Sequence, residues 1–302
     1  AKAVIWTTTP WTIPVNQAIA YGPDVNYMLL NVIDGDKQPM WLIAEDLVPT
    51  FLSRMGFPPL ESGEVDGKSV VYDFVVKGSE LAGTIARHPM HHLGGFYAKP
   101  RPFLPGEFVT TDSGTGLVHM APDHGEDDFL LCKQHGIEPV FAVNADGLYR
   151  DDWPWLGGHD ERRRAVINPN FNAPDGPICS DLREAGALLA ASADYRHSYP
   201  HSWRSKAKVI YRCTPQWFVP MDRELAGAGT LRERALTAIA DTRFVPEKGR
   251  NRIGSMVEGR PDWVLSRQRA WGVPITLFVK RGTGDYLQDP EVNSRVIAAV
   301  RD

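Results

Sequence analysis

The sequence predicts an α+β fold that is rich in strands and loops. The 302 residues include 27 glycines and 24 prolines, which favours many turns between short elements. Several runs have the apolar pattern of strands, while other segments place apolar residues at helical spacing. A chain of this length can bury a substantial core, and it corresponds to one large domain or two.

The first part of the chain is expected to consist mainly of strands. Residues 4–8 have a strand pattern that should end before Pro10, because proline has no amide hydrogen and disfavours a helical conformation in the residue before it. One helix is expected over residues 44–55, where apolar residues recur at helical spacing and Gly56 provides a stop. Further strand patterns occupy residues 25–33, 40–44, 69–77 and 103–111.

The later part of the chain changes character. Helices are expected over residues 180–189 and 225–240, with a strand over residues 209–213. Aromatic and basic residues interleave between residues 197 and 208, a pattern that suits single-stranded nucleic acid through stacking and phosphate neutralisation. We expect a domain boundary near residues 214–225.

The stretch from Gly114 to Phe129 is the strongest candidate for a functional site, since it holds three glycines, two histidines and four acids. Gly114 and Gly116 allow backbone conformations or close approaches that a Cβ atom would forbid. Residues 117–120 alternate as a strand would, which directs His119 to one face.

A helix is expected over residues 124–135, directly after this strand. Asp123 and Glu126 have the spacing of a capping box, and Gly136 provides a stop. Asp127 and Asp128 would then lie in the first turn, where free amides and the helix dipole should keep a carboxylate ionised. Our hypothesis is that His119 and Asp128 line one pocket, with Asp128 facing a positively charged group of the ligand.

Two other interpretations of this stretch remain open. Acids in a first helical turn are usually caps, and a histidine at a strand end is often a structural residue. A metal site is also conceivable, with His119, His124, Asp127 and Asp128 as possible ligands, but their spacing matches neither His-Glu-x-x-His nor a Cys/His zinc pattern. No metal is therefore predicted.

Composition limits the class of protein. A net charge of −4 excludes a uniformly basic nucleic-acid binder, but it leaves room for a local basic face. No apolar run approaches the roughly 18 residues of a membrane span, so no membrane partner is expected. The three cysteines are widely spaced and form no disulfide framework, which favours a cytoplasmic setting. The chain begins in a strand pattern and ends in a helical one, as an excised piece of a larger protein would.

The segment from Thr7 to Asn16 has three adjacent threonines before Pro10. Their hydroxyls would suit a pocket that orients a water molecule or an ester. The alternative is ordinary β-propensity, because threonine is common in strands.

Five segments, in this order along the chain, resemble isoleucine–tRNA ligases of the bacterial type. They are Trp6–Asn16, Gly114–Asp128, His197–Arg204, Thr214–Phe218 and Arg260–Pro274. The two ATP-binding signatures of that family, His-x-Gly-His and Lys-Met-Ser-Lys-Ser, do not occur in the sequence. The resemblance therefore implies the insertion that edits mischarged tRNA, followed by a part of the nucleotide-binding domain.

The resemblance implies a fold and a domain organisation. Residues 1–214 would form a β-barrel-like editing domain with peripheral helices. Residues 215–302 would form a connection that returns to the catalytic domain, as a partial α/β segment. The chain would act as a monomer without a cofactor, whereas the longer parent protein would charge tRNA(Ile) with isoleucine, using ATP and magnesium.

The implied activity is hydrolysis of valine from mischarged Val-tRNA(Ile). A pocket for isoleucine cannot strongly exclude valine, which is one methylene smaller, and this enzyme is the standard example of that limit. In the family, the acid that matches Asp128 holds the α-amino group, and the residue that matches His119 shapes the pocket against isoleucine. Further site residues are expected in two segments. The threonine segment would contribute Thr7, Thr8, Thr9, Thr12 and Asn16, with Trp11 as part of the pocket wall. The stretch from Gly114 to Phe129 would contribute Gly114, Gly116 and His124.

Two departures from the family affect these expectations. Asp123 stands where relatives usually have glycine, so it either caps the helix or alters the entrance of the site. Ser202 and Val264 stand where cysteine is common, which argues against zinc in this segment. The competing classes are a non-catalytic module that binds the tRNA acceptor end, a metal-dependent hydrolase, and the editing domain of a valine or leucine enzyme.

Overall fold

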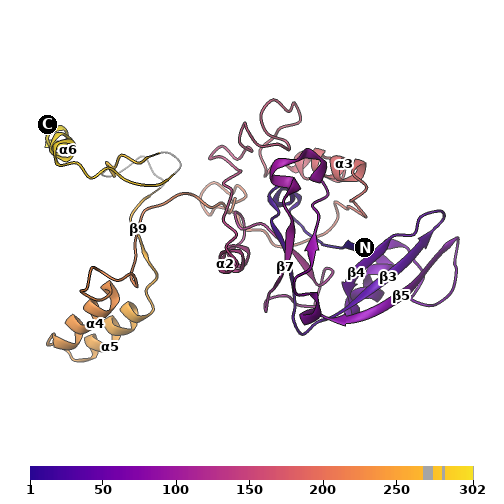
Figure 1. Ribbon diagram of the computed structural model, residues 1–302, viewed down its shortest axis with the longest axis horizontal. Coiled ribbons are helices and arrows are strands. Elements are labelled where there is room, and N and C mark those ends of the chain that lie inside the picture. Colours follow the sequence, from indigo (N-terminus) through magenta and orange to yellow (C-terminus); the bar gives the residue numbers. More distant parts are fainter. Residues whose placement is uncertain (268–274, 281–282, 302) are drawn as a thin grey trace. The chain divides into compact units, whose positions relative to one another are not determined.

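The computed structural model describes residues 1–267, 275–280 and 283–301, and the chain divides into two compact units, Ala1–Cys213 and Thr214–Asp302 (Figure 1). The α+β class is confirmed. Strands and helices are described in both units, and no described helix is long and apolar enough to cross a membrane. That the first unit is an editing domain and the second a connection stays a prediction.

The first sheet of unit 1 has the strand order β1-β4-β3-β5, with β1 and β4 parallel and the other pairs antiparallel. Its strands are β1 (Lys2–Ala3), β3 (Asn26–Asp34), β4 (Met40–Ala44) and β5 (Lys68–Lys77). Helix α1 (Val48–Met55) packs against it through Val48 and Leu52 and ends at Gly56, which has a left-handed φ of 68°. The predicted helix and its stop are confirmed, as are the three strands expected in this region.

The second sheet of unit 1 has the order β6-β7-β2-β8, in which only β2 and β7 are parallel. Its strands are β2 (Ala18–Tyr21), β6 (Ile85–Ala86), β7 (Arg101–Pro105) and β8 (Leu117–Met120). Helix α2 (Glu126–Gln134) covers it with Leu131 and Cys132. The described strands thus form two separate sheets, so the expected barrel is not closed among the described residues.

The remaining part of unit 1 is mostly loop around a second apolar cluster that contains Trp11, Tyr97, Tyr149, Trp153 and Phe171. Helix α3 (Pro177–Glu184) packs into this cluster. Short 3-10 turns occupy Pro10–Val15, Glu45–Leu47, Gly78–Leu81, His91–Leu93, Gly95–Ala98 and Pro169–Phe171.

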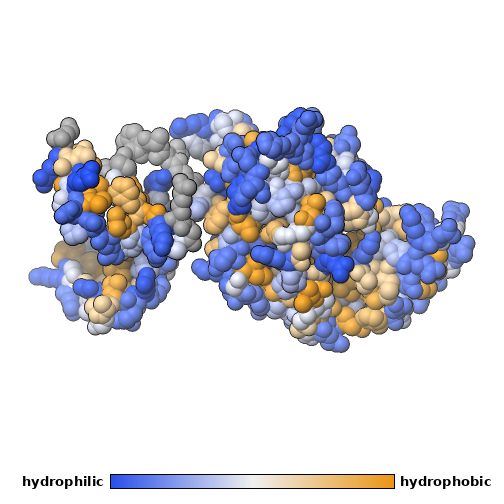
Figure 2. Space-filling model, turned by 45° about the horizontal axis from the view of Figure 1, so that its top comes forward, coloured by the Kyte–Doolittle hydropathy of each residue, from blue (hydrophilic) through white to orange (hydrophobic). Residues whose placement is uncertain are grey.

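Two strands predicted for unit 1 do not form, and the strand expected over residues 103–111 ends at Pro105. Residues 4–8 are not a strand, because the chain leaves β1 after Ala3 and turns toward the 3-10 segment that begins at Pro10. Residues 209–213 are not a strand either; only an isolated bridge joins His201 to Lys208. The face drawn in Figure 2 is mainly hydrophilic with scattered hydrophobic patches. Val71 and Phe74 on the edge strand β5 are exposed.

Unit 2 contains helices α4 (Leu231–Asp241), α5 (Lys248–Glu258) and α6 (Pro290–Arg301), and a two-stranded antiparallel ribbon of β9 (Phe218–Val219) and β10 (Trp263–Val264). The parallel sheet of the expected α/β segment does not occur among its described residues. Thr230 and Glu233 form a reciprocal capping box at the start of α4.

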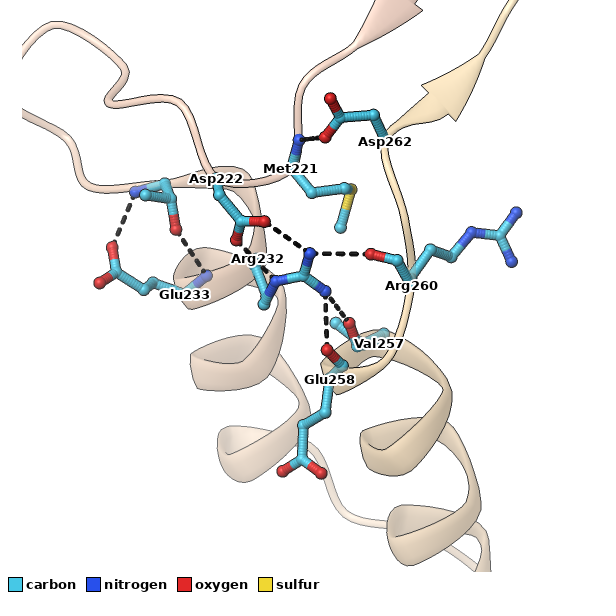
Figure 3. A network of polar contacts seen from close by, with 9 residues as sticks. Met221, Asp222, Arg232, Glu233, Val257, Glu258, Arg260 and Asp262 are labelled. Atoms are coloured by element: carbon cyan, nitrogen blue, oxygen red, sulfur yellow. Dashed lines mark hydrogen bonds and ion pairs between the residues drawn. The ribbon is translucent and has the colours of Figure 1, made fainter. Parts of the chain in front are cut away.

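Arg232 joins α4 to the end of α5 and to the segments that carry Asp222 and Arg260 (Figure 3). Its guanidinium forms a bidentate ion pair with Asp222 at 2.7 and 2.8 Å. It also donates to the carbonyl oxygens of Val257 and Glu258 at the end of α5, and to that of Arg260. One side chain therefore satisfies the free carbonyls at a helix end and fixes the chain around α4.

Candidate functional site

The candidate site lies where strand β8 passes into helix α2. Asp128 is in the first turn of α2, and its Oδ2 accepts a hydrogen bond of 2.7 Å from the amide of Ala121, directly after β8. The carbonyl oxygen of Ala121 accepts the amide of His124 at 2.9 Å. This turn links the strand that carries His119 to the helix that carries Asp128, with His124 between them. That His119 and Asp128 line one pocket stays a prediction.

The charge state of Asp128 differs from the expectation. Burial raises the pKa of its carboxyl to about 6, although the amide of Ala121 acts in the opposite direction. Position in a first helical turn alone predicted a readily ionised group, but the cost of removing the charge from water is larger here. The carboxylate is therefore ionised only above about pH 6, where a cation beside it would be strongly favoured.

Gly125, which sequence reasoning missed, makes the position of Asp128 possible. It is the residue that precedes α2, and a Cβ atom there would lie 2.8 Å from Cγ of Asp128. A side chain at residue 125 would thus displace the carboxylate. The sequence signal that could have identified this role is the position of Gly125 directly after His124, within the stretch from Gly114 to Phe129.

The threonine segment turns toward β8 at the 3-10 turn Pro10–Val15. The amide of Thr9 donates to Oγ1 of Thr7 at 3.0 Å, and the carbonyl oxygen of Thr9 accepts from the hydroxyl of Thr12 at 2.9 Å. The same Thr12 hydroxyl lies 2.9 Å from Nε2 of His119. The predicted Thr12 and His119 are therefore in direct contact, across 107 residues of sequence.

This contact assigns the hydrogen on His119. The Thr12 hydroxyl has one proton, which it donates to Thr9, so Nε2 of His119 must be the donor in the second bond. Burial lowers the pKa of His119 to about 4, so the ring is neutral at neutral pH and its Nδ1 carries a lone pair. That Nδ1 is buried and has no hydrogen-bond partner within the described part of the chain.

His124 has the opposite tautomer. Its Nδ1 lies 2.7 Å from the carbonyl oxygen of Tyr211, which can only accept, so Nδ1 carries the hydrogen. Burial lowers its pKa, and its Nε2 is a buried atom without a partner among the described residues. The ring packs edge-on against the buried Trp11 with centroids 4.5 Å apart, which places the expected wall residue beside the site.

The other predicted residues differ in whether the fold already uses their polar groups. Thr8 is half-buried, and within the described ranges its hydroxyl forms no hydrogen bond, so it is available to a ligand. Asn16 is buried, and its amide donates to the carbonyl oxygen of Ala18 at 2.8 Å, which is a structural contact. Gly114 has a φ of 83°, and a Cβ atom there would lie 3.5 Å from the ring of Trp6.

Gly116 has a clear packing reason. Its φ is 74°, and a Cβ atom would come within 2.3 Å of the Cβ of Ala44 on β4. Its carbonyl oxygen accepts the hydroxyl of the buried Tyr27 at 2.6 Å. The two sheets approach each other at this residue, and any role in substrate binding stays a prediction.

Asp123 does not cap α2, so the predicted capping box was wrong. Its buried carboxylate accepts the amides of Val140 and Phe141, which fixes a loop 17 residues away. The position before the helix is taken by Gly125, without a side-chain cap. Asp123 thus stabilises the base of the site rather than the helix end.

The loop that carries His88 is flanked by proline and glycine residues, which predicts a surface position, but His88 is buried. Its Nδ1 accepts the amide of Met90 at 3.0 Å, and its Nε2 therefore donates to the carbonyl oxygen of Ile13 at 3.2 Å. Burial lowers the pKa of this imidazole to about 3. His88 thus supports the turn that carries Thr12.

Across the described ranges, no three histidine, cysteine, aspartate or glutamate side chains are grouped so that they could hold a metal ion. The last motif segment, residues 260–274, lies partly outside those ranges.

Sequence comparison assigns the chain to a class of proteins. The model of the family described as tRNA synthetases class I (I, L, M and V) matches residues 10–302, so the chain belongs to this family. The chain is 61% identical to the isoleucine–tRNA ligase of Zymomonas mobilis over 99% of its own length, and 45% identical to that of Gluconobacter oxydans over 100%. The resemblance to isoleucine–tRNA ligases is confirmed.

The chain spans about 30% of the length of these curated relatives. Among solved structures it is similar to the P. knowlesi cytosolic leucyl-tRNA synthetase editing domain, with a TM-score of 0.34, 16% identity, and coverage of 45% of this chain and 52% of that one. A likeness at this level supports no inference about the site.

Proposed function

We propose that unit 1 is an editing hydrolase that removes valine from mischarged Val-tRNA(Ile). The observation that carries the proposal is the position of Asp128, a half-buried carboxylate that accepts a hydrogen bond of 2.7 Å from the Ala121 amide. Ala121 follows two residues after His119, which is hydrogen-bonded to Thr12. Family membership and the isoleucine–tRNA ligase relatives support it.

Asp128 would bind the α-ammonium group of the valyl ester. The pKa of about 6 leaves the carboxylate ionised at neutral pH. Asp128 has no basic partner in the part of the chain that the structure describes, and a half-buried carboxylate of this kind gains strongly from a cation. Neutral His119 and His124 each present a bare nitrogen that accepts hydrogen bonds from the ammonium or from ribose hydroxyls.

The chemistry would be the attack of an oriented water. An aminoacyl ester is already activated, so the water oxygen adds to the ester carbonyl carbon, the bond to the ribose oxygen breaks, and the ribose oxygen takes a proton from the water. The hydroxyls of Thr8 and Thr9 would position this water. Thr12 is no nucleophile, since its proton is given to the Thr9 carbonyl and His119 donates to it rather than activating it.

Selection against isoleucine would follow from the walls of the pocket. His119 is fixed by its bond to Thr12, and Trp11 is buried and packed against His124. A rigid wall excludes one additional methylene by steric overlap. A pocket built for isoleucine, in contrast, can only bind the smaller valine side chain more weakly. We infer that the longer protein joins isoleucine to tRNA(Ile) with ATP and magnesium, as a cytoplasmic monomer.

The direct experiment is deacylation of Val-tRNA and Ile-tRNA, both on the isoleucine-accepting tRNA, by the purified chain with and without a chelator. The proposal expects faster release of valine and no effect of the chelator. A module that only binds the acceptor end would retard the tRNA in a gel and leave both esters intact. A loss of activity with the chelator would instead indicate a metal-dependent hydrolase.

A further inference from the structure

A row of aromatic rings runs along residues 195–201 of unit 1. Tyr195, His197, Tyr199 and His201 alternate in sequence, and neighbouring ring centroids are 6.0, 6.2 and 6.4 Å apart. These successive contacts make the four rings a continuous strip. We call this strip, together with Trp203, the aromatic ladder.

The ladder ends in a hairpin with an exposed tryptophan at its tip. The amide of Ser202 donates to Ala207 at 2.8 Å, and the amide of Val209 donates to Pro200 at 3.1 Å, which closes the hairpin. Trp203 is 76% exposed, and the guanidinium of Arg204 lies 4.8 Å from its ring centroid. A large apolar ring is thus held in solvent beside a cation.

The charge around the ladder differs from that of the rest of the chain. Residues 195–212 contain five arginines and lysines and no acid, while the whole chain has a net charge of −4. One of these cations, Lys208, lies 5.5 Å from the ring of Tyr199. Stacking rings interleaved with cations, without acids, is the pattern that binds single-stranded nucleic acid independently of sequence.

Both ends of this segment join the candidate site. At one end, Tyr195 packs edge-on against Trp6 with centroids 5.0 Å apart, and Trp6 directly precedes the threonine segment. At the other end, the carbonyl oxygen of Tyr211 accepts Nδ1 of His124. A chain whose end lay in the site would therefore meet the ladder.

We propose that the aromatic ladder binds the unpaired nucleotides of single-stranded RNA that precede the esterified end. This inference rests on the proposed function for the identity of the RNA, but the ladder's affinity for single-stranded RNA can be measured without any hydrolysis.

The test is fluorescence anisotropy of a short labelled oligoribonucleotide with the full chain. The variants are Tyr195→Ala with Trp203→Ala, the conservative Trp203→Phe, and Lys206→Ala with Lys208→Ala. Phe74→Ala on β5 is the matched control, since Phe74 is an exposed aromatic residue at 48% in a different sheet. Thermal unfolding shows whether each variant keeps its fold.

Stacking predicts a loss of about tenfold in affinity for each ring removed, near-normal binding for Trp203→Phe, and no change for Phe74→Ala. Each lysine that contacts a phosphate should contribute about 0.7 to the slope of log K against log salt, so the double lysine variant should lower the slope by about 1.4.

Three results would overturn the inference: no binding of the oligoribonucleotide by the unaltered chain, equal affinity for a duplex of the same sequence, or unchanged affinity in the ring variants. Hydrolysis of valyl-adenosine by the unaltered chain is measured in parallel. If the ring variants bind RNA more weakly but the unaltered chain does not hydrolyse valyl-adenosine, the ladder is supported and the proposed function fails. If the unaltered chain hydrolyses valyl-adenosine but the ring variants bind RNA as well as it does, only the ladder is rejected.

Discussion

Replacement of Asp128 by asparagine separates the chemical role of the carboxylate from its structural role. Asparagine can still accept the hydrogen bond from the Ala121 amide, but it carries no charge. Burial raises the pKa of Asp128 from 3.8 to about 6, a difference that corresponds to at most about 3 kcal/mol between the charged and neutral forms.

The sign of this effect follows from proton binding. The folded protein holds the Asp128 proton more tightly than the unfolded chain does, so the stabilisation is complete below about pH 4 and is lost as the pH rises through about 6. At pH 8 the ionised Asp128 therefore costs stability, and Asp128→Asn should unfold at the same or a higher urea concentration. At pH 4 this advantage should disappear.

Activity should change in the opposite direction. A charge-assisted bond contributes about 1.5–3 kcal/mol, so loss of the carboxylate should lower kcat/KM for the valyl ester by roughly 10- to 100-fold. In the unaltered chain, kcat/KM should rise with pH through about 6 as Asp128 ionises. The matched control is Asp127→Asn, because Asp127 is exposed in the same helical turn.

Deacylation rates at pH 5 and pH 8, and urea unfolding at pH 4 and pH 8, test this prediction together. Equal hydrolysis by Asp128→Asn and the unaltered chain would refute the role of the carboxylate. A variant that is inactive only because it is unfolded at pH 8 would refute the assignment of the buried charge as a cost.

Three further predictions concern contacts around the site and in unit 2. Gly116→Ala should lower the free energy of unfolding in urea by on the order of 1–3 kcal/mol, because residue 116 combines a positive φ with an overlap of the added Cβ atom. Gly35 has a φ of 59° and open space around it, so Gly35→Ala should lower this free energy less. Equal losses in the two variants would contradict the overlap. Thr12→Val leaves the Nε2 hydrogen of His119 without an acceptor and should cost about 1–3 kcal/mol and slow hydrolysis, with Thr12→Ser restoring both; a fully active, stable valine variant would show that the pair is dispensable. Arg232→Met removes the bonds to the end of α5 and should speed hydrogen exchange in α4 and α5 without slowing hydrolysis of valyl-adenosine; unchanged exchange would show that the network is not stabilising.

Local sequence rules predicted the structure correctly where a single residue or a short pattern determines it. Gly56 ends α1 because glycine adopts the left-handed conformation at little cost, and the apolar spacing of residues 44–55 gave the helix. The strand β8 and the first-turn position of Asp128 followed in the same way.

Local sequence rules failed to predict the structure where a segment distant in sequence binds the same side chain. Asp123 has the spacing of a cap, but the amides of Val140 and Phe141 bind its carboxylate instead. Burial of Asp128 depends on how α2 packs on its sheet, so the pKa could not be predicted from the helix dipole alone.

The sequence named residues for the candidate site but did not predict the contacts between them. The resemblance identified Thr12, His119 and Asp128, but a bond across 107 residues has no local pattern. Burial of His88 was missed for the same reason: its partner Ile13 lies 75 residues away.

The most direct test of the central claim is the hydrolysis of valyl-adenosine and isoleucyl-adenosine by the purified chain, because these small esters need no contact with the rest of a tRNA. The proposed site predicts release of valine at a rate well above the uncatalysed reaction, slower release of isoleucine, and loss of both in Asp128→Asn but not in Asp127→Asn. Intact valyl-adenosine after prolonged incubation with folded protein would contradict the claim that residues 1–213 contain an editing site.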